Sequence, residues 1–497
     1  SADKDAGAAF LKYKDFKPYV DYFNSMEDEN IAQAIPNARA SQWMEENIPL
    51  FECSQKNFEE MYYYRWWTLR KHIKETPVGY GMTEFLVNRS YADKYNLIAC
   101  AIGHHIYESR WLRNPEYLNQ IIHTWYRGNE GGPMAKMTKF SSWNADAVLG
   151  RYMVDGNKEF LLDMVKDLEA EYARWEKTNR LPNGLYWQGD VQDGMEESIS
   201  GGRRKQYARP TINSYMYGNA KALSLIGIMT GDEGMAMKYG LKADSIKTLV
   251  QDKLWNTDHH FFETMRGDAS AEVREAIGYI PWYFNLPDAS SKYTVAWKEV
   301  MDEKGFSAPY GLTTAERRHP EFRTHGVGKC EWDGAIWPFA SAQTLTAMAN
   351  FMNNYPQTVL TDSVYFHQME RYVESQHHRG RPYIGEYLDE VTGYWLKGDQ
   401  ERSRYYNHST FNDLMITGLI GLRPRMDNTV EVNPLIPEGK WDYFCLDNVL
   451  YHGRNLTILW DKDGSRYQRG KGLHIYVDGK EVGHADTLTR VLCENVL

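Results

Sequence analysis

Apolar side chains recur at three- and four-residue steps along most of residues 57–421, which is the spacing of amphipathic helices. Within 157–178 this apolar stripe alternates with Lys, Glu and Asp, so the pattern predicts an outer helix with one solvated face. Residues 332–352 carry no charge after Asp333, which predicts a helix that is buried on most sides. Helices of these two kinds follow one another along the chain.

The pattern predicts twelve helices, which pair as six hairpins. They lie near residues 57–73, 93–108, 115–127, 141–154, 157–178, 210–230, 234–254, 270–284, 292–303, 332–352, 361–377 and 406–421. Outer helices that alternate with buried inner ones predict a mainly α fold, an (α/α)6 toroid or barrel. The connections 179–209 and 305–331 are long and rich in Gly, Arg and Trp, which is typical of functional loops at one barrel mouth.

After residue 421 the apolar period changes to two, the spacing of half-buried strands. The predicted strands are 429–432, 443–446, 456–460 and 473–477. Asp-Gly pairs at 463–464 and 478–479 supply turns between them. We therefore expect three parts: an N-terminal arm (1–55), a barrel domain that holds the chemistry (56–423) and a small C-terminal antiparallel β-domain (424–497).

Aromatic residues make up 14% of the 497 residues, with 16 Trp and 35 Tyr. Such rings suit the apolar faces of sugars, although a large core also uses them. The net charge is −10 without a basic run, so we expect no nucleic-acid partner. No apolar run reaches the roughly 20 residues that span a bilayer. The five cysteines lack metal-ligand spacing, so we expect no metal, no cofactor and no disulfide framework.

The loop 189–202 concentrates four carboxylates beside Trp187, namely those of Asp190, Asp193, Glu196 and Glu197. A carboxyl in an apolar, aromatic setting has a raised pKa and suits proton donation near neutral pH. The alternatives are a calcium loop or a solvated acidic turn. The spacing does not match a helix–loop–helix calcium site.

Glu386 lies in the loop Gly385-Glu386-Tyr387 and supplies a second acidic side chain. Most glycosidases need two carboxyl groups, an acid for the leaving oxygen and a base or nucleophile on the other face of the sugar. A solvated loop charge is the alternative for this residue. The acidic loop and Glu386 are about 190 residues apart, and loops that converge on one barrel mouth would bring them together.

Three segments carry a resemblance to a known superfamily. Gly194-Met-Glu-Glu-Ser198 resembles the general-acid loop of (α/α)6 glycoside hydrolases such as families 63 and 37, which generally carry Asp where this chain has Glu196. The segment 331–338 (Glu-Trp-Asp-Gly-Ala-Ile-Trp-Pro) is similar to their Trp-Gly-rich segment, and Gly385-Glu386-Tyr387 to their general-base loop. The β-appendage resembles those of related six-hairpin glycosidases, including the family 142 β-L-arabinofuranosidase group.

This resemblance implies an inverting glycoside hydrolase that removes terminal sugars from oligo- or polysaccharides. Glu196 would be the acid and Glu386 the base, with Asp193 and Asp190 as the reserve candidates for the acid. The alternative for Asp193 is a group that tunes Glu196 or hydrogen-bonds a sugar hydroxyl. Inversion predicts carboxyl groups about 6.5–9.5 Å apart. The Glu in place of Asp at 196 moves the proton donor by one methylene and indicates a divergent family.

Candidate substrate-binding residues are aromatic or charged side chains near the predicted mouth: Arg65, Trp66, Trp143, Trp187, Trp332, Asp333 and Tyr387. For Arg65 and Trp66 a buried aromatic helix is an equal alternative. Two other function classes stay open, a catalytically inactive glycan-binding protein and a polysaccharide lyase that uses residues 405–408 (Tyr-Tyr-Asn-His). The chain begins Ser-Ala-Asp-Lys without Met, so we expect a processed protein in the periplasm or outside the cell.

Overall fold

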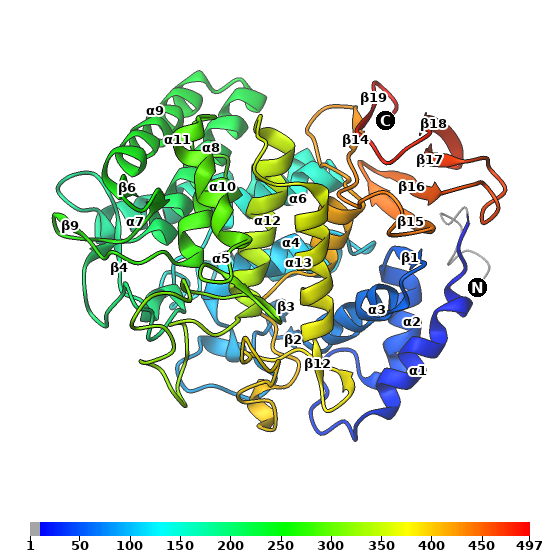
Figure 1. Ribbon diagram of the computed structural model, residues 1–497, viewed down its shortest axis with the longest axis horizontal. Helices are drawn as coiled ribbons and strands as arrows, with labels where there is room; N and C mark the ends of the chain where they lie inside the picture. Colours follow the sequence, from blue (N-terminus) through cyan, green and yellow to red (C-terminus); the bar gives the residue numbers. More distant parts are fainter. Residues whose placement is uncertain (1–9) are drawn as a thin grey trace.

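A computed structural model describes residues 10–497 and shows two layers of helices beside a five-stranded β-sheet (Figure 1). The main helices are α3 (Lys56–Lys71), α4 (Ile102–Ser109), α5 (Glu116–Arg127), α6 (Asn144–Asp155), α7 (Lys158–Asn179), α8 (Pro210–Thr230), α9 (Glu233–Leu249), α12 (Pro338–Asn354) and α13 (Asp362–Ser375). This arrangement confirms the (α/α)6 toroid with a C-terminal β-domain. Within residues 10–497, no helix has the length and apolar character needed to cross a membrane.

The inner and outer helices differ in burial as their sequences predict. α12 carries no charged side chain and is buried along almost its whole length, and α8 carries only Lys221. α7 buries one stripe and exposes its Lys, Glu and Asp residues. At Gly227 of α8 an added Cβ would lie 2.5 Å from the backbone nitrogen of Ala236, so glycine lets α8 and α9 approach closely.

Four predicted helices are short or interrupted in the structure. Residues 93–108 are α-helical only from α4 onward, after two short 3₁₀ turns. Residues 292–303 contain the short helix α11 (Ser291–Thr294) and the 3₁₀ turn η7 (Val295–Val300). Residues 270–284 contain only the short helix α10 (Ile280–Tyr283), preceded by irregular chain and a 3₁₀ turn. Residues 406–421 stay irregular until α14 (Asn412–Leu414), which continues as the π-helical turn η9 (Met415–Leu419). The carboxylate of Glu108 in α4 accepts the backbone N–H groups of residues 411, 412 and 413 at 2.8–3.0 Å, which caps this late helix start.

The β-domain uses strands from both ends of the chain. The sheet order is β1 (Leu50–Cys53), β15 (Tyr443–Tyr451), β16 (Arg454–Asp461), β17 (Gly472–Val477) and β18 (Lys480–Ala485), with every neighbouring pair antiparallel. Because β1 belongs to the segment expected to be a lead-in arm, that segment is a structural part of the sheet. The exact domain boundaries stay a prediction.

The arm also packs on the barrel. Its helices α1 (Lys17–Ser25) and α2 (Asn37–Asn47) lie against α3, where Phe23 contacts the rings of Tyr64 and Trp67. The described chain begins at residue 10 beside the sheet, near the C-terminus (Figure 1), where the backbone N–H of Phe10 donates to Asp447 at 2.7 Å. The arm therefore links the β-domain to the first barrel helix.

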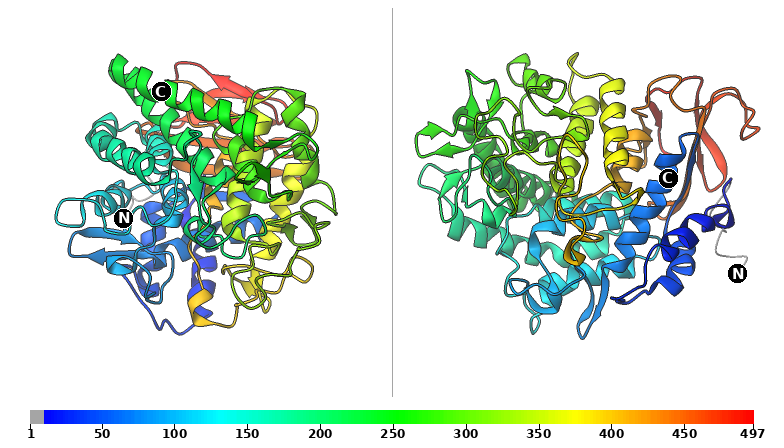
Figure 2. Two further views of the ribbon diagram at one scale, coloured as in Figure 1. Left: turned by 90° about the vertical axis from the view of Figure 1, so that its left-hand side faces the viewer. Right: turned by 60° about the horizontal axis from the view of Figure 1, so that its bottom comes forward.

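Three long loops precede the N-termini of inner helices: 180–209 before α8, 301–337 before α12 and 376–411 before α14. Since inner helices run in the same direction, these loops meet at one end of the barrel. That end faces down in Figure 1 and comes forward in the right-hand view of Figure 2. It is the end where the chemistry was predicted.

Candidate active site

Asp193 holds the acidic loop in place. It lies in the 3₁₀ turn η4 (Val191–Asp193), has a fully buried side chain, and accepts hydrogen bonds from Arg209 Nε at 2.7 Å and Thr211 Oγ1 at 2.6 Å. Ser141 donates to its other carboxylate oxygen. Because both carboxylate oxygens of Asp193 accept hydrogen bonds from protein groups, the structure favours a positioning role for this residue.

Glu196 follows the left-handed turn at Gly194 and keeps partial exposure to solvent. Burial of its carboxyl, together with the negative charges of Glu386 and Asp190, raises the pKa of Glu196 to about 7. Such a carboxyl keeps its proton at mildly acidic pH and gives it up readily to a leaving oxygen. The geometry therefore favours Glu196 over Asp193 as the proton donor.

Glu386 has the opposite electrostatic setting. It is only 4% exposed, and its carboxylate lies 3.4 Å from both Lys397 Nζ and Arg402 Nη2. Cys330 directs its thiol at the same carboxylate, 3.9 Å away. Positive charge therefore surrounds the carboxylate that the sequence predicts as the general base.

The segment 326–331 connects the two carboxylates. The hydroxyl group of Tyr387 donates a hydrogen bond to the backbone carbonyl of Lys329. A Cβ atom added at Gly326 would lie 3.0 Å from the Cβ atom of Glu197, so this segment also packs closely against the acid loop. The pKa of Cys330 is raised to about 12 by burial and by the charges of both Glu196 and Glu386. The acid loop and the base loop therefore face the same space, with Cys330 next to both.

Glu84 is a site residue that the sequence analysis missed. It is buried, and accepts hydrogen bonds from Tyr406 and from the Cys100 thiol at 2.9 Å. Burial raises its pKa to about 7, and the charges of Glu386 and Glu196 add to this effect. The signal in the sequence was an acid directly before the apolar run Phe85-Leu-Val87.

Tyr406 and His408, the pair that a lyase would use, are poorly suited to that chemistry. Burial and the nearby charges of Glu84 and Glu386 raise the pKa of Tyr406 well above its usual range. Burial lowers the pKa of His408 well below 6.5, and its ring packs against those of Tyr406 and Trp337. A phenolate base is therefore disfavoured here.

Three predicted substrate contacts, Trp332, Asp333 and Tyr387, lie in or next to the segments that hold Cys330 and Glu386, whereas Trp337 was not predicted. Trp332, Trp337 and Tyr387 form an aromatic column, with ring centroids 4.7 Å and 4.6 Å apart. Within residues 10–497, the buried indole N–H of Trp332 has no hydrogen-bond acceptor. Asp333 is fully buried and accepts the backbone N–H groups of residues 325 and 326, at 2.5 Å and 3.2 Å, so it fixes the connecting segment.

Three other predicted contacts lie in the core of the barrel. Arg65 donates to Gln376 Oε1 and Ser409 Oγ, both at 2.8 Å. Trp66 and Trp143 are fully buried, and Trp143 donates its indole hydrogen to a tyrosine hydroxyl at 3.1 Å. Their bonds favour the core alternative. Trp187, in β4 (Trp187–Gln188), is partly exposed at the edge of the acid loop and stays a candidate.

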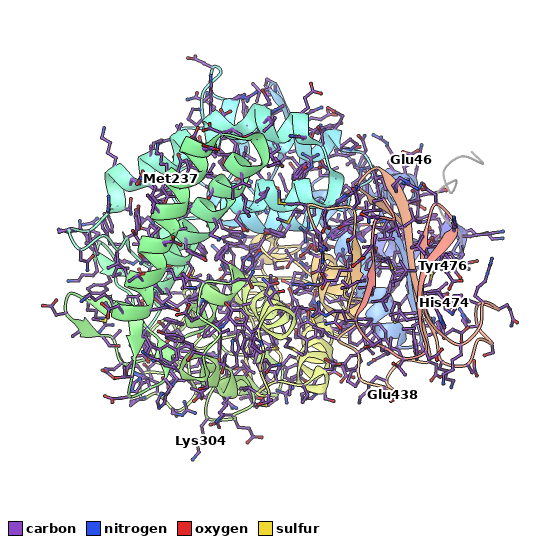
Figure 3. All side chains as sticks on the ribbon, turned by 90° about the horizontal axis from the view of Figure 1, so that it is seen from above. Glu46, Met237, Lys304, Glu438, His474 and Tyr476 are labelled. Atoms are coloured by element: carbon purple, nitrogen blue, oxygen red, sulfur yellow. The ribbon has the colours of Figure 1, made fainter. Side chains whose placement is uncertain are left out.

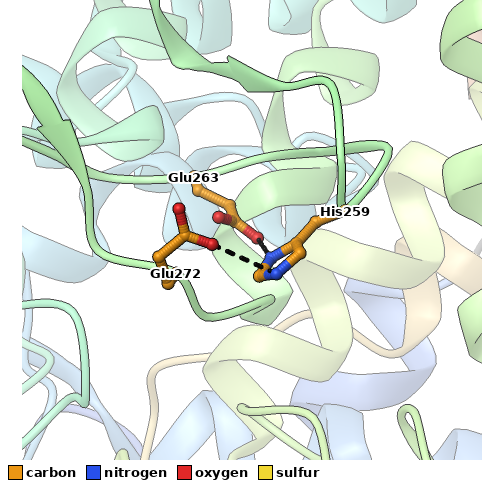
Figure 4. A group of neighbouring side chains, drawn as sticks. All are labelled: His259, Glu263 and Glu272. Atoms are coloured by element: carbon orange, nitrogen blue, oxygen red, sulfur yellow. Dashed lines mark hydrogen bonds and ion pairs between the residues drawn. The ribbon is translucent and has the colours of Figure 1, made fainter.

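One group outside this site combines metal-ligand side chains (Figure 4). His259 Nδ1 lies 2.7 Å from Glu263, and His259 Nε2 lies 3.1 Å from Glu272. The two ring nitrogens point in different directions, so one ion cannot bind both. Asn256 and Ser270 also donate to the Glu263 carboxylate at 2.8 Å. The hydrogen bonds satisfy this cluster without a cation.

A six-hairpin toroid with two carboxyl groups of contrasting environment at the N-terminal ends of its inner helices defines a glycoside hydrolase, which acts on carbohydrate. The sequence matches the mannosylglycerate hydrolase MGH1-like glycoside hydrolase domain over residues 94–409. It also matches the C-terminal domain of glycosyl hydrolase family 65 over residues 422–484. The chain belongs to the MGH1-like glycoside hydrolase family.

Solved structures agree with this assignment. A chain named "Sialidase" is 84% identical, with a TM-score of 0.99 over 100% of this chain and 46% of that one. The present chain thus spans about half the length of that relative. A family 63 mannosylglycerate hydrolase from Thermus thermophilus in complex with glucose has 12% identity and a TM-score of 0.53, over 72% of this chain and 99% of that one.

A family 78 rhamnosidase of Bacillus sp. GL1 has 12% identity and a TM-score of 0.55, over 86% of this chain and 41% of that one. At this identity the likeness to the Thermus and Bacillus enzymes shows the fold alone.

Proposed function

We propose that this chain is the catalytic unit of an inverting glycosidase that removes one terminal sugar at a time. The observation that carries the proposal is the contrast between Glu196, whose pKa is raised to about 7, and Glu386, which lies between two cations. A carboxyl group with a pKa near 7 can still donate a proton at neutral pH, as the acid of such an enzyme requires, and Glu386 is the second carboxyl group that the reaction needs.

In the proposed step, Glu196 gives its proton to the glycosidic oxygen as the bond from that oxygen to the anomeric carbon breaks. Glu386 takes a proton from a water molecule, whose oxygen bonds to the anomeric carbon from the opposite face. The products are an alcohol and a free sugar of inverted anomeric configuration. Exchange with solvent then returns the proton to Glu196 and removes it from Glu386.

For the substrate we propose terminal β-L-arabinofuranosides, because the β-appendage resembles that of the family 142 group. The mannosylglycerate hydrolase and rhamnosidase relatives supply two comparison substrates. A sialoside is a third, since the 84% identical relative is named a sialidase. That name belongs to a chain about twice as long, so it does not assign sialoside cleavage to this segment. Periplasmic or extracellular location is also proposed, and cell fractionation tests it.

The decisive experiment follows hydrolysis by proton NMR with each of these four substrates. The proposal expects the β-L-arabinofuranoside to be cleaved and the first sugar formed to have the opposite anomeric configuration. Glu386→Gln should abolish this turnover and leave sugar binding nearly intact.

Retained configuration would refute inversion, and turnover by Glu386→Gln would remove Glu386 from the mechanism. Absorbance from an unsaturated uronate would instead establish the lyase alternative. Sugar binding without turnover by the unaltered chain would establish the inactive glycan-binding protein.

A further inference from the structure

A cavity of about 670 Å³ lies at the other end of the barrel, away from the catalytic loops. Its walls come from the second halves of α6, α8 and α12 and from the link to the β-domain, with Tyr217, Asn350 and Arg423 among the lining residues. This end faces up in Figure 1 and toward the viewer in Figure 3. The cavity is large enough for a mono- or disaccharide.

The inner helices separate this cavity from the proposed active site. Asn350 comes twelve residues after Pro338, where α12 begins beside the catalytic segment. At about 1.5 Å per residue, this distance along the axis is about 18 Å. A ligand in the cavity would therefore bind independently of a sugar at Glu196 and Glu386.

Two cations that line the cavity, Arg423 and Lys221, form no ion pair with a carboxylate of the described residues. Arg423 donates only to neutral oxygens, Thr417 O at 3.0 Å and Asn350 Oδ1 at 2.7 Å, and among residues 10–497 no carboxylate lies within ion-pair distance of it. Lys221 is a solvent-exposed residue that lines the cavity, and it likewise has no ion-pair partner in the described chain. These two positive charges favour an anion.

The other charged groups do not cancel this excess. Arg110 forms an ion pair with Asp413 at 2.8 Å, and Arg425 forms one with Glu431 at 2.9 Å. Lys247 is paired at 2.8 Å with an aspartate that does not line the cavity. The remaining carboxyl group, Asp146, accepts the Tyr107 hydroxyl at 2.6 Å, and burial raises its pKa to about 7, so it is only partly ionised at neutral pH.

Aromatic rings complete the walls. Tyr107, Tyr217, Tyr283 and Phe284 line the cavity, and Tyr107 offers the most accessible ring of the four. Rings of this kind pack on the apolar faces of sugar rings, whereas a simple inorganic anion gains nothing from them. The combination of rings, unpaired cations and neutral hydrogen-bonding groups matches a sugar that carries a carboxylate.

We propose that this far-end cavity is a second, non-catalytic binding site for an acidic monosaccharide, of the uronic acid class. Lys221 and Arg423 bind the carboxylate, and the aromatic walls contact the ring. The site requires no chemistry and does not depend on the proposed glycosidase mechanism.

The test is isothermal titration calorimetry of the whole chain with D-glucuronate, D-glucose and inorganic sulfate as separate probes. We expect glucuronate to bind at least about tenfold more tightly than glucose or sulfate, because each of those lacks either the charge or the ring. Lys221→Ala should weaken glucuronate binding about tenfold, and so should Arg423→Gln, with circular dichroism confirming that each variant is folded.

Lys238→Ala is the matched control, since Lys238 is exposed on α9 and does not line the cavity. It should bind glucuronate normally, and so should Glu386→Gln. Equal binding of glucose or sulfate would overturn the proposal, as would unchanged affinity in folded Lys221→Ala. Loss of glucuronate binding in Glu386→Gln would place the ligand at the catalytic mouth and would overturn it too.

Discussion

Replacing Glu196 by Gln is the sharpest test of the acid assignment, because the amide keeps the shape of the side chain and removes only the proton. With a pKa of about 7, Glu196 is about nine-tenths protonated at pH 6 and about one-tenth at pH 8. The rate constant kcat/KM of the unaltered enzyme should therefore fall about tenfold per pH unit above 7.

The size of the effect depends on the leaving group. A poor leaving group needs the proton, so Glu196→Gln should lower its kcat/KM by about 10²–10⁴-fold. A dinitrophenolate leaving group departs without being protonated. The kcat/KM of Glu196→Gln for a dinitrophenyl glycoside should therefore stay within about tenfold of that of the unaltered enzyme. In the variant the decline above pH 7 should disappear, because no group is left to lose its proton.

The assay measures kcat/KM from pH 5 to 9 for aryl glycosides with leaving groups of different acidity. Glu197→Gln is the matched control: it removes the neighbouring carboxylate, whose Oε1 lies 3.8 Å from Arg203. An equal loss in Glu197→Gln would refute the assignment. So would an alkaline decline that persists in Glu196→Gln, or the same loss with every leaving group.

Three further predictions concern stability. Asp193→Asn breaks a fully buried ion pair with Arg209 and should lower the free energy of unfolding by about 3–5 kcal/mol, measured by urea titration; a loss below about 1 kcal/mol would contradict the positioning role. Burial raises the pKa of Glu84 from 4.5 to about 7. Its contribution to the free energy of unfolding should therefore be fully present below pH 4.5. The free energy of unfolding should then fall by about 3 kcal/mol as the pH rises from 4.5 through 7. Urea titrations at pH 5 and 8 should show a smaller pH difference for Glu84→Gln, and an unchanged difference would contradict this. Zinc should leave the Tm of the protein unchanged, because hydrogen bonds already satisfy the cluster of His259, Glu263 and Glu272. His259→Ala should lower the Tm, because it removes one of these hydrogen bonds. A zinc-dependent rise in Tm that is lost in His259→Ala would show a metal site.

The elements with a strong apolar period were predictable because periodicity is local. α7 and α8 lie within one residue of their predicted bounds, since a helix that buries a stripe must repeat it every three to four residues. The segments 270–284 and 406–421 were not predictable in this way. Their apolar residues are buried by the surrounding barrel, so the same spacing arises without a continuous helix.

The sequence by itself determined the toroid, the β-domain and the two loops that hold Glu196 and Glu386. The spacing of apolar residues predicts the helices and strands, and short motifs identify the two loops. Only the tertiary structure separates the environments of the candidate acids Glu196 and Asp193. The environment of a carboxyl group is set by residues that the fold brings next to it. Arg209 forms a buried ion pair with Asp193, while burial and the charge of Glu386 raise the pKa of Glu196. Glu84 joins the site from another hairpin for the same reason, since burial and long-range charge have no pattern in the local sequence.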